Sequence, residues 1–247
     1  MIVQDWLTSR PMAHRGLFDN KAIPENSLAA FERAISLNHP IEFDVRQTRD
    51  GIPVVFHDRS LFRMTGRNAL VSNATWNEIR NASLLGSNQA IPSLEAALEF
   101  INGRVPVLVE IKNEGRGRDI EENTANLLDK YAGQFAVQSF NPLSLRWFIN
   151  FRPNVCRGQL AGGIKGLPAI NRLIDLFLVR GCANRISHPH FIAYYIGAGD
   201  VLFFENMKKR LEMPLILWTA DTVEKRSFCE ELGTNYIFEQ SAMPAST

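Results

Sequence analysis

Two short apolar runs of this chain each end in a histidine that is followed at once by a charged residue. His14 ends "MAH" and precedes Arg15, and His57 ends "PVVFH" and precedes Asp58. An unperturbed imidazole titrates near pH ~6.5, so paired histidines can exchange protons with a substrate near neutral pH. We interpret His14 and His57 as a candidate acid–base pair. The other three histidines lie in loop contexts without comparable neighbours.

Carboxylates form a second pattern. Side chains alternate along a strand with period two, so Glu42 and Asp44 of "IEFDV" face the same side. Glu110 stands near the end of another apolar run, "VLVEI". Three carboxylates at the carboxyl ends of strands suit a hard divalent cation, Mg²⁺ or Ca²⁺. The alternative for any one of them is an ion pair with Arg15 or Lys112.

Arg15 and Lys112 supply fixed positive charge close to these groups in the sequence. A guanidinium suits two phosphate oxygens, and an ammonium acts as a point charge. With a divalent cation they would stabilise negative charge on a phosphate, while one histidine removes a proton and the other protonates the leaving alkoxide. The residues therefore predict a metal-dependent phosphodiesterase, without assigning base and acid between His14 and His57.

The elements that must position these side chains alternate between strands and helices. We expect strands at 12–14, 40–45, 53–57, 105–111, 135–140, 155–161, 182–186, 214–219 and 235–238. Amphipathic helical patterns lie between most of them, as in "NSLAAFERAISL", where Asn26 or Ser27 serves as the N-cap. About eight strand–helix units in 247 residues predict an α/β fold, a TIM-type (β/α)8 barrel.

The stretch 40–58 holds two strand candidates whose connection is too short for a crossover helix. One interpretation is a hairpin about Asp50-Gly51, in which a two-residue turn sets Asp44 opposite His57. The other is a barrel that lacks its second helix. Both interpretations bring His57 near Asp44.

Residues 59–91 interrupt the alternation, because they are polar and rich in Asn and Ser. We expect them to form a small insertion after the His57-Asp58 strand, over one face of the barrel. The whole chain, 1–247, is expected to be a single domain of this barrel type.

The net charge, the apolar runs and the cysteines indicate what kind of partner and compartment to expect. The net charge is +1, from 27 basic and 26 acidic residues, which favours neither nucleic acid nor an anionic membrane as a partner. No apolar run approaches the roughly 18 residues of a transmembrane helix, and the first residues lack a signal-peptide pattern. Cys156, Cys182 and Cys229 are widely spaced, which indicates free buried thiols. We expect a cytoplasmic protein with a small-molecule substrate.

The same residues, in this order, resemble the glycerophosphodiester phosphodiesterase family, within the PLC-like phosphodiesterase superfamily. The resemblance rests on "AHRG", "PENS", "LAAF", "IEFDVRQTRDGIPVVFHD", "IPSLEAAL", "VEIK", "QSFNP" and "LWT". It spans about residues 11–240, and the run 41–58 is its most specific part.

The resemblance implies a TIM-type barrel that cleaves glycerophosphodiesters to glycerol 3-phosphate and an alcohol, with one Mg²⁺ or Ca²⁺ bound. In family members a hydroxyl of the glycerol moiety can attack phosphorus first, which gives a cyclic phosphate that water then opens. The site residues carry over by motif as the acid–base pair His14 and His57, the metal ligands Glu42, Asp44 and Glu110, and the phosphate contacts Arg15 and Lys112.

Two aromatic residues are candidates for contacts with the substrate, and two departures from the family pattern bear on which alcohol it releases. Trp218 of "LWT" is placed by the resemblance against the glycerol carbons, and Phe140 of "QSF" is a similar candidate; core packing is the alternative for both. Ala220-Asp221 stand where the family usually has Val-Asn, and Phe238-Glu239 replace a Thr-Asp pair. We expect these departures to leave the catalytic set intact and to affect the preference for the leaving alcohol.

Two other functions are compatible with the same residues. Related barrels act on lysophospholipids in the manner of a lysophospholipase D, which requires an exposed apolar entrance. A barrel without catalysis could bind phosphodiesters with the same ligands, although both histidines are present. The leading hypothesis is hydrolysis of glycerophosphodiesters, in glycerol and lipid metabolism.

Overall fold

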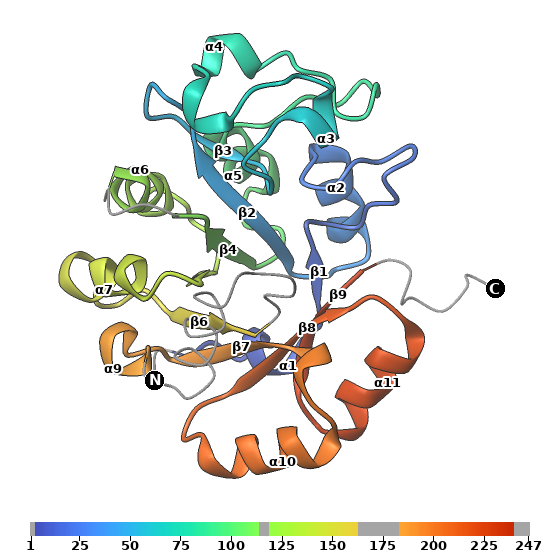
Figure 1. The fold of residues 1–247 in the computed structure, drawn as a ribbon, viewed down its shortest axis with the longest axis vertical. Coiled ribbons are helices and arrows are strands. Elements are labelled where there is room, and N and C mark those ends of the chain that lie inside the picture. The colour runs from blue at the N-terminus through green and yellow to red at the C-terminus, as the bar shows by residue number, and fades with distance from the viewer. Residues whose placement is uncertain (1–2, 114–118, 163–182, 240–247) are drawn as a thin grey trace. The chain divides into compact units, whose positions relative to one another are not determined.

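The computed structural model describes residues 3–113, 119–162 and 183–239. The chain divides into two compact units, an N-terminal unit (Ala13–Phe135) and a C-terminal unit (Met1–Met12 with Ala136–Thr247). Figure 1 shows their helices and strands. That the chain is a single domain over 1–247 stays a prediction.

Parallel strands form the base of the N-terminal unit. β1 (Met12–His14) pairs with β2 (Ile41–Gln47), which pairs on its other side with β4 (Val107–Ile111). β2 and β4 are buried along most of their length, so polar side chains on their inner face are withdrawn from water. The remaining elements are α2 (Leu28–Ser36), β3 (Pro53–Val55), α3 (Phe62–Thr65), η1 (Val71–Asn73), α4 (Trp76–Ile79), α5 (Leu94–Ile101) and α6 (Asp119–Leu128).

The C-terminal unit continues the same strand–helix alternation. Its strands pair in chain order, and all the pairings are parallel: β5 (Phe135–Ser139), β6 (Arg157–Ala161), β7 (Phe191–Tyr195), β8 (Leu215–Ala220) and β9 (Asn235–Phe238). Its helices are α1 (Trp6–Ser9), α7 (Pro142–Phe151), α9 (Asn184–Ser187), η2 (Ile196–Ala198), α10 (Val201–Arg210) and α11 (Val223–Glu231). Figure 1 shows α11 alongside β8 and β9, in orange and red.

Over the described residues, eight parallel strands with helices between them confirm the predicted TIM-type (β/α)8 barrel. The strand predicted at 182–186 is wrong, because Asn184–Ser187 forms the helix α9. The strand in this region is β7, "FIAYY", which the sequence assignment missed. Its aromatic and β-branched residues are typical of a strand, whereas Asn184 and Arg185 fit poorly in a buried one.

The stretch 40–58 is a hairpin, which decides between the two interpretations, but the predicted register is wrong. β2 and β3 are antiparallel, with Val45 opposite Val55, and the backbone N–H of Phe56 donates to the carbonyl of Asp44. Asp44 is therefore aligned with Phe56 and not with His57. The reason is a three-residue loop that ends in Gly51 at φ +84°, a common alternative to the two-residue turn.

Residues 59–91 form the predicted insertion and have a small hydrophobic core of their own. α3, η1 and α4 lie within it, and Figure 1 shows α4 and α3 near β3. Its buried apolar side chains pack with two from the hairpin, and the cluster comprises Val54, Phe56, Leu61, Met64, Val71, Ala74, Ile79, Ala82, Leu84 and Ile91. The insertion is thus anchored on the strand that precedes His57.

Within the described residues, no helix combines the length and the apolar character that crossing a membrane requires. Cys156 and Cys229 are buried free thiols, as predicted, and burial raises the pKa of each to about 12. Cys182 lies outside the described residues.

Gly16 follows β1 at a point where the chain passes close to α2. Its φ is +77°, and a Cβ there would lie 2.8 Å from the backbone of Ala30. Gly16→Ala should destabilise the protein by about 1–2 kcal/mol for the left-handed conformation, plus roughly 1–3 kcal/mol for the steric overlap. Chemical denaturation measures the loss.

Gly66 provides a matched control, because its φ is +70° but a Cβ would meet no atom within 4 Å. Gly66→Ala should therefore carry only the conformational cost. Equal losses for the two variants would show that the close approach to Ala30 does not constrain the fold.

Candidate active site

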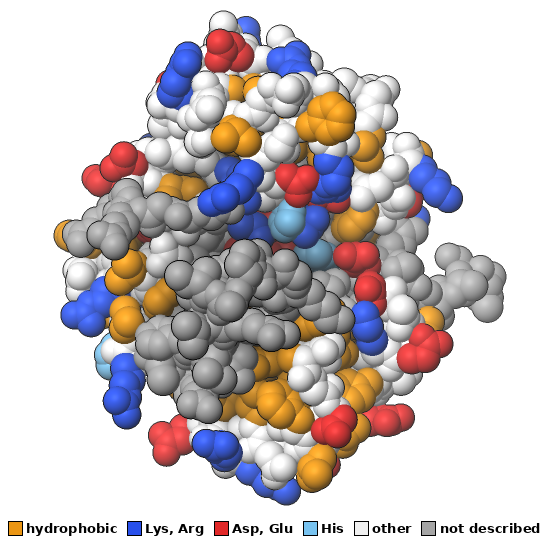
Figure 2. Space-filling model, in the orientation of Figure 1, with side chains coloured by type: hydrophobic (Ala, Val, Ile, Leu, Met, Phe, Trp, Pro, Cys, Tyr) orange, Lys and Arg blue, Asp and Glu red, His pale blue; other side chains and the backbone are white. Residues whose placement is uncertain are grey.

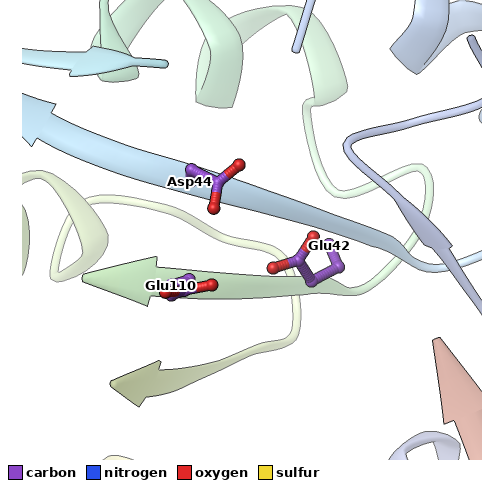
Figure 3. A group of neighbouring side chains, drawn as sticks. All are labelled: Glu42, Asp44 and Glu110. Atoms are coloured by element: carbon purple, nitrogen blue, oxygen red, sulfur yellow. The ribbon is translucent and has the colours of Figure 1, made fainter. Parts of the chain in front are cut away.

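Three buried carboxylates converge on the inner face of β2 and β4. Glu42 and Asp44 lie on β2 and Glu110 on β4, with Asp44 directly opposite Glu110 in the parallel ladder. Figure 3 shows their carboxylates turned toward one another, and one ligand atom of each lies within 4.8 Å of the others. The predicted common face of Glu42 and Asp44, and the approach of Glu110, are therefore observed.

Two cations neutralise Asp44, the most deeply enclosed of the three. The Lys112 Nζ lies 3.0 Å from Asp44 Oδ1 and 2.6 Å from Glu110 Oε1, and the Arg15 Nε lies 3.2 Å from Asp44 Oδ2. Burial alone would raise the pKa of Asp44, but the charges of Lys112, His57 and Arg15 hold it well below its usual range. Asp44 is thus ionised although its side chain is buried.

Glu42 is less well compensated. Burial raises its pKa well above the ordinary value, and the charges of Asp44 and Glu110 raise it further against those of Arg15 and Lys112. A divalent cation between the carboxylates would favour the ionised form of all three. Oxygen donors, burial and close spacing therefore fit a hard divalent cation.

Both predicted histidines border this triad. His14 is the partner of Glu42 in the β1–β2 ladder, and the charges of His57 and His14 both lower the pKa of Asp44. Both side chains are only half-buried, and Figure 2 shows histidine side chains at the surface among acidic and basic ones. Both histidines are thus accessible to a small molecule.

The orientation of His57 is set by its neighbour in the chain. His57 Nδ1 lies 2.7 Å from Asp58 Oδ1. The hydrogen bond from His57, with that from Arg63, lowers the pKa of Asp58, so this carboxylate is ionised and can only accept. Nδ1 therefore carries the proton, and Nε2 of the neutral ring remains available as a base.

Arg63 was not predicted as a site residue, and it connects Asp58 to Glu25 in the loop before α2. Its Nε lies 2.6 Å from Asp58 Oδ2, and its Nη2 lies 2.7 Å from Glu25 Oε1, which also receives a hydrogen bond from Arg15. Burial would raise the pKa of Glu25, but Arg63 and Arg15 lower it to about 2. The only signal for Arg63 in the sequence is its charge, five residues after Asp58.

Asn26 also belongs to the site. The N-cap of α2 is Ser27, whose hydroxyl accepts from the N–H of Ala30, so the choice between Asn26 and Ser27 is decided. Asn26 instead donates through Nδ2 to Asp44 Oδ2 at 2.9 Å. Asn26 and Arg15 have φ of 56° and 53°, a conformation that non-glycine residues adopt mainly where surrounding contacts impose it.

The two predicted aromatic residues belong to the C-terminal unit. Phe140 and Trp218 contact each other edge to face, with ring centroids 5.7 Å apart, and the ring centroid of Tyr195 lies 5.3 Å from that of Trp218. The structure thus brings the aromatic candidates together with each other, and the seven polar candidates together in the N-terminal unit. The substrate contacts of Phe140 and Trp218 stay predictions.

The two departures from the family pattern have different surroundings. Ala220 and Phe238 are buried, so they pack in the interior of their unit. Asp221 forms an ion pair with Lys225 in the first turn of α11. Their effect on the leaving alcohol stays a prediction.

Known proteins share both the sequence and the fold. The YhdW protein of Bacillus subtilis (strain 168), a provisionally named glycerophosphodiester phosphodiesterase, is 33% identical over 235 residues, which cover 92% of each chain. A glycerophosphodiester phosphodiesterase of Caldanaerobacter subterraneus is 34% identical over 160 residues, 60% of this chain and 65% of its own. A solved phosphodiesterase of Oleispira antarctica, in complex with the product sn-glycerol-3-phosphate, has a TM-score of 0.79 at 22% identity over 95% of this chain and 94% of its own.

The family model described as "Glycerophosphoryl diester phosphodiesterase family" matches residues 14–239. This match begins at His14, and it includes the carboxylate triad, His57 and Lys112. It covers most of the chain, and the relative from Bacillus subtilis is similar over nearly its full length. The chain belongs to the glycerophosphoryl diester phosphodiesterase family.

Proposed function

We propose that this protein hydrolyses glycerophosphodiesters to glycerol 3-phosphate and an alcohol, with His14 and His57 as the acid–base pair. The observation that carries the proposal is the buried triad of Glu42, Asp44 and Glu110 with both histidines at its border. The product bound to the Oleispira relative supports the same reaction class.

The chain's own residues can hold the phosphate and move the protons. Arg15 and Lys112 lie at the carboxylates and offer positive charge to phosphate oxygens. One histidine takes the proton of the attacking group, water or the glycerol hydroxyl, as the new P–O bond forms, and the other gives a proton to the alkoxide as the old P–O bond breaks. Where the glycerol hydroxyl attacks, water then opens the cyclic phosphate to glycerol 3-phosphate. Mg²⁺ or Ca²⁺ held by the triad would supply further charge stabilisation at the equatorial oxygens.

Turnover tests the proposal directly. We expect the purified protein, supplied with Mg²⁺ or Ca²⁺, to release glycerol 3-phosphate from glycerophosphocholine in a coupled assay. His14→Ala should lower kcat by about 10²–10⁴-fold, the usual contribution of a general acid or base. Binding of the diester to His14→Ala, measured by calorimetry, should survive.

His39→Ala is the control, because His39 lies in the loop between α2 and β2 and has no role in the proposed reaction. Its kcat should stay at the wild-type value. Near-full turnover by His14→Ala would contradict the acid–base role. Cleavage of lysolipids in strong preference to water-soluble diesters would favour a lysophospholipase D activity instead.

The metal assignment has a test that is independent of turnover. Calorimetric titration of the chelator-treated protein should detect one equivalent of Mg²⁺ or Ca²⁺, and the relative affinities identify the preferred ion. Glu42→Gln removes a carboxylate ligand and should weaken binding by at least about tenfold. The exposed Glu99→Gln serves as control and should bind like the wild type. Unchanged affinity in Glu42→Gln would rule out the triad as the site.

Asp58 acts through His57 and is a positioning residue. Asp58→Asn removes the carboxylate that accepts from Nδ1, so kcat should fall about 10- to 100-fold, part of the contribution of acid–base catalysis. KM should stay constant, because Asp58 is not expected to contact substrate. The exposed Asp129→Asn is the matched control. A rise in KM at unchanged kcat would assign Asp58 to substrate binding instead.

A further inference from the structure

A groove of about 730 Å³ lies beside the carboxylate triad, within the N-terminal unit. Its walls come from the end of β2, the hairpin loop, the insertion, the residues after β4 and the start of α6. The volume is ample for a small polar molecule. The proposed reaction uses one residue of this lining, Lys112.

The lining is strongly basic. Arg46, Arg49, Arg59 and Lys112 contribute four cationic side chains, and Asp119 is the acidic residue among the described lining residues. Arg49 and Arg59 are exposed, and Ser72 and Asn113 add a hydroxyl and an amide. Such a lining is suited to an anion with several oxygen atoms.

The groove adjoins the site at two residues. Lys112 lines the groove and also contacts Asp44 and Glu110, at 3.0 and 2.6 Å. Arg46 lies two positions after Asp44 on the same face of β2, and its Nε donates to the carbonyl of His57 at 2.6 Å. These two residues thus place the basic lining next to the triad.

The charge in the groove exceeds what the reacting phosphate requires. Arg15 and Lys112 already lie at the triad, and the glycerol half of the substrate carries no charge. Arg46, Arg49 and Arg59 line the groove in addition. Arg46 is near enough to Asp44, Glu110 and Asp58 for their charges to oppose the lowering of its pKa by burial. Arg49 Nη2 lies 3.9 Å from Glu78 Oε2, an exposed contact that competes only weakly with a bound anion. A cationic alcohol such as choline would be repelled there, whereas an alcohol with its own phosphate would be attracted.

We propose that the groove binds the leaving alcohol of the substrate and selects diesters in which that alcohol carries a second phosphate group. This inference rests on the proposed function and specifies its substrate class. Hydrolysis at the triad would break the bond between the first phosphate and the alcohol, so that the first phosphate leaves as glycerol 3-phosphate and the second stays with the alcohol in the groove.

Three substrates that differ in the charge of the alcohol test the inference. They are glycerophosphocholine (cationic), glycerophosphoglycerol (neutral) and bis(glycerophospho)glycerol, whose alcohol keeps a second phosphodiester. We expect kcat/KM to rise in that order, by about tenfold or more between the neutral and the anionic substrate. The preference should shrink as salt is added, because exposed charges are screened.

The double variant Arg49→Gln/Arg59→Gln should lower the ratio of kcat/KM for the anionic to the neutral substrate by about tenfold. The control Arg80→Gln/Lys130→Gln removes two exposed charges of the same unit that do not line the groove. It should leave the ratio at the wild-type value. Equal kcat/KM for all three substrates, or a ratio that both double variants share with the wild type, would overturn the inference.

Binding to an inactive variant separates this inference from the proposed function. Bis(glycerophospho)glycerol is titrated calorimetrically into His14→Ala, with and without the two groove substitutions. Tighter binding than glycerophosphoglycerol, weakened about tenfold by Arg49→Gln/Arg59→Gln, supports the groove even if no diester is hydrolysed. Turnover of all three diesters with equal affinities supports the proposed function and contradicts the groove.

Discussion

The ionised state of Asp44 is the constraint on which the arrangement of the N-terminal unit depends. A carboxylate that is fully buried is stable only when cations and hydrogen-bond donors surround it. Lys112, which follows β4, and Arg15 and the amide of Asn26, both from the loop before α2, meet that requirement from two segments far apart in the sequence. The loop before α2 accordingly adopts unusual backbone conformations at Arg15 and Asn26, because their contacts with Asp44 and its neighbours hold them there.

A second set of charges connects the insertion to the histidine that it follows. Glu25, Arg63 and Asp58 form a continuous series of short contacts that ends at His57 Nδ1. Arg63 lies on α3, inside the insertion, whose own hydrophobic core is packed on the hairpin. The core of the insertion therefore holds α3 in place, and α3 holds Arg63 against the carboxylate that orients His57.

Local periodicity predicts the parts of the site that lie on strands. Alternation along "IEFDV" gives the shared face of Glu42 and Asp44, and the parallel alignment of β2 with β4 brings Glu110 opposite Asp44. Elements whose geometry depends on a loop are predicted less well. One additional loop residue before Gly51 moves Asp44 out of register with His57. Arg63 reaches the site through a contact with Glu25 that no spacing in the sequence indicates.

A net charge of +1 for the whole chain gives no indication of anion binding, yet the N-terminal unit separates its charges. At the triad, acids and bases alternate and compensate one another, so the pKa of each group depends on its neighbours. Along the groove, basic side chains predominate. One of them, Arg46, lies on β2 on the same face as Glu42 and Asp44. The strand β2 thus presents two acidic residues where a metal cation would bind, and next to them a basic residue, Arg46, that would face an anionic alcohol. This order along β2 can orient a diester with its reacting phosphate at the triad and a charged alcohol beyond it.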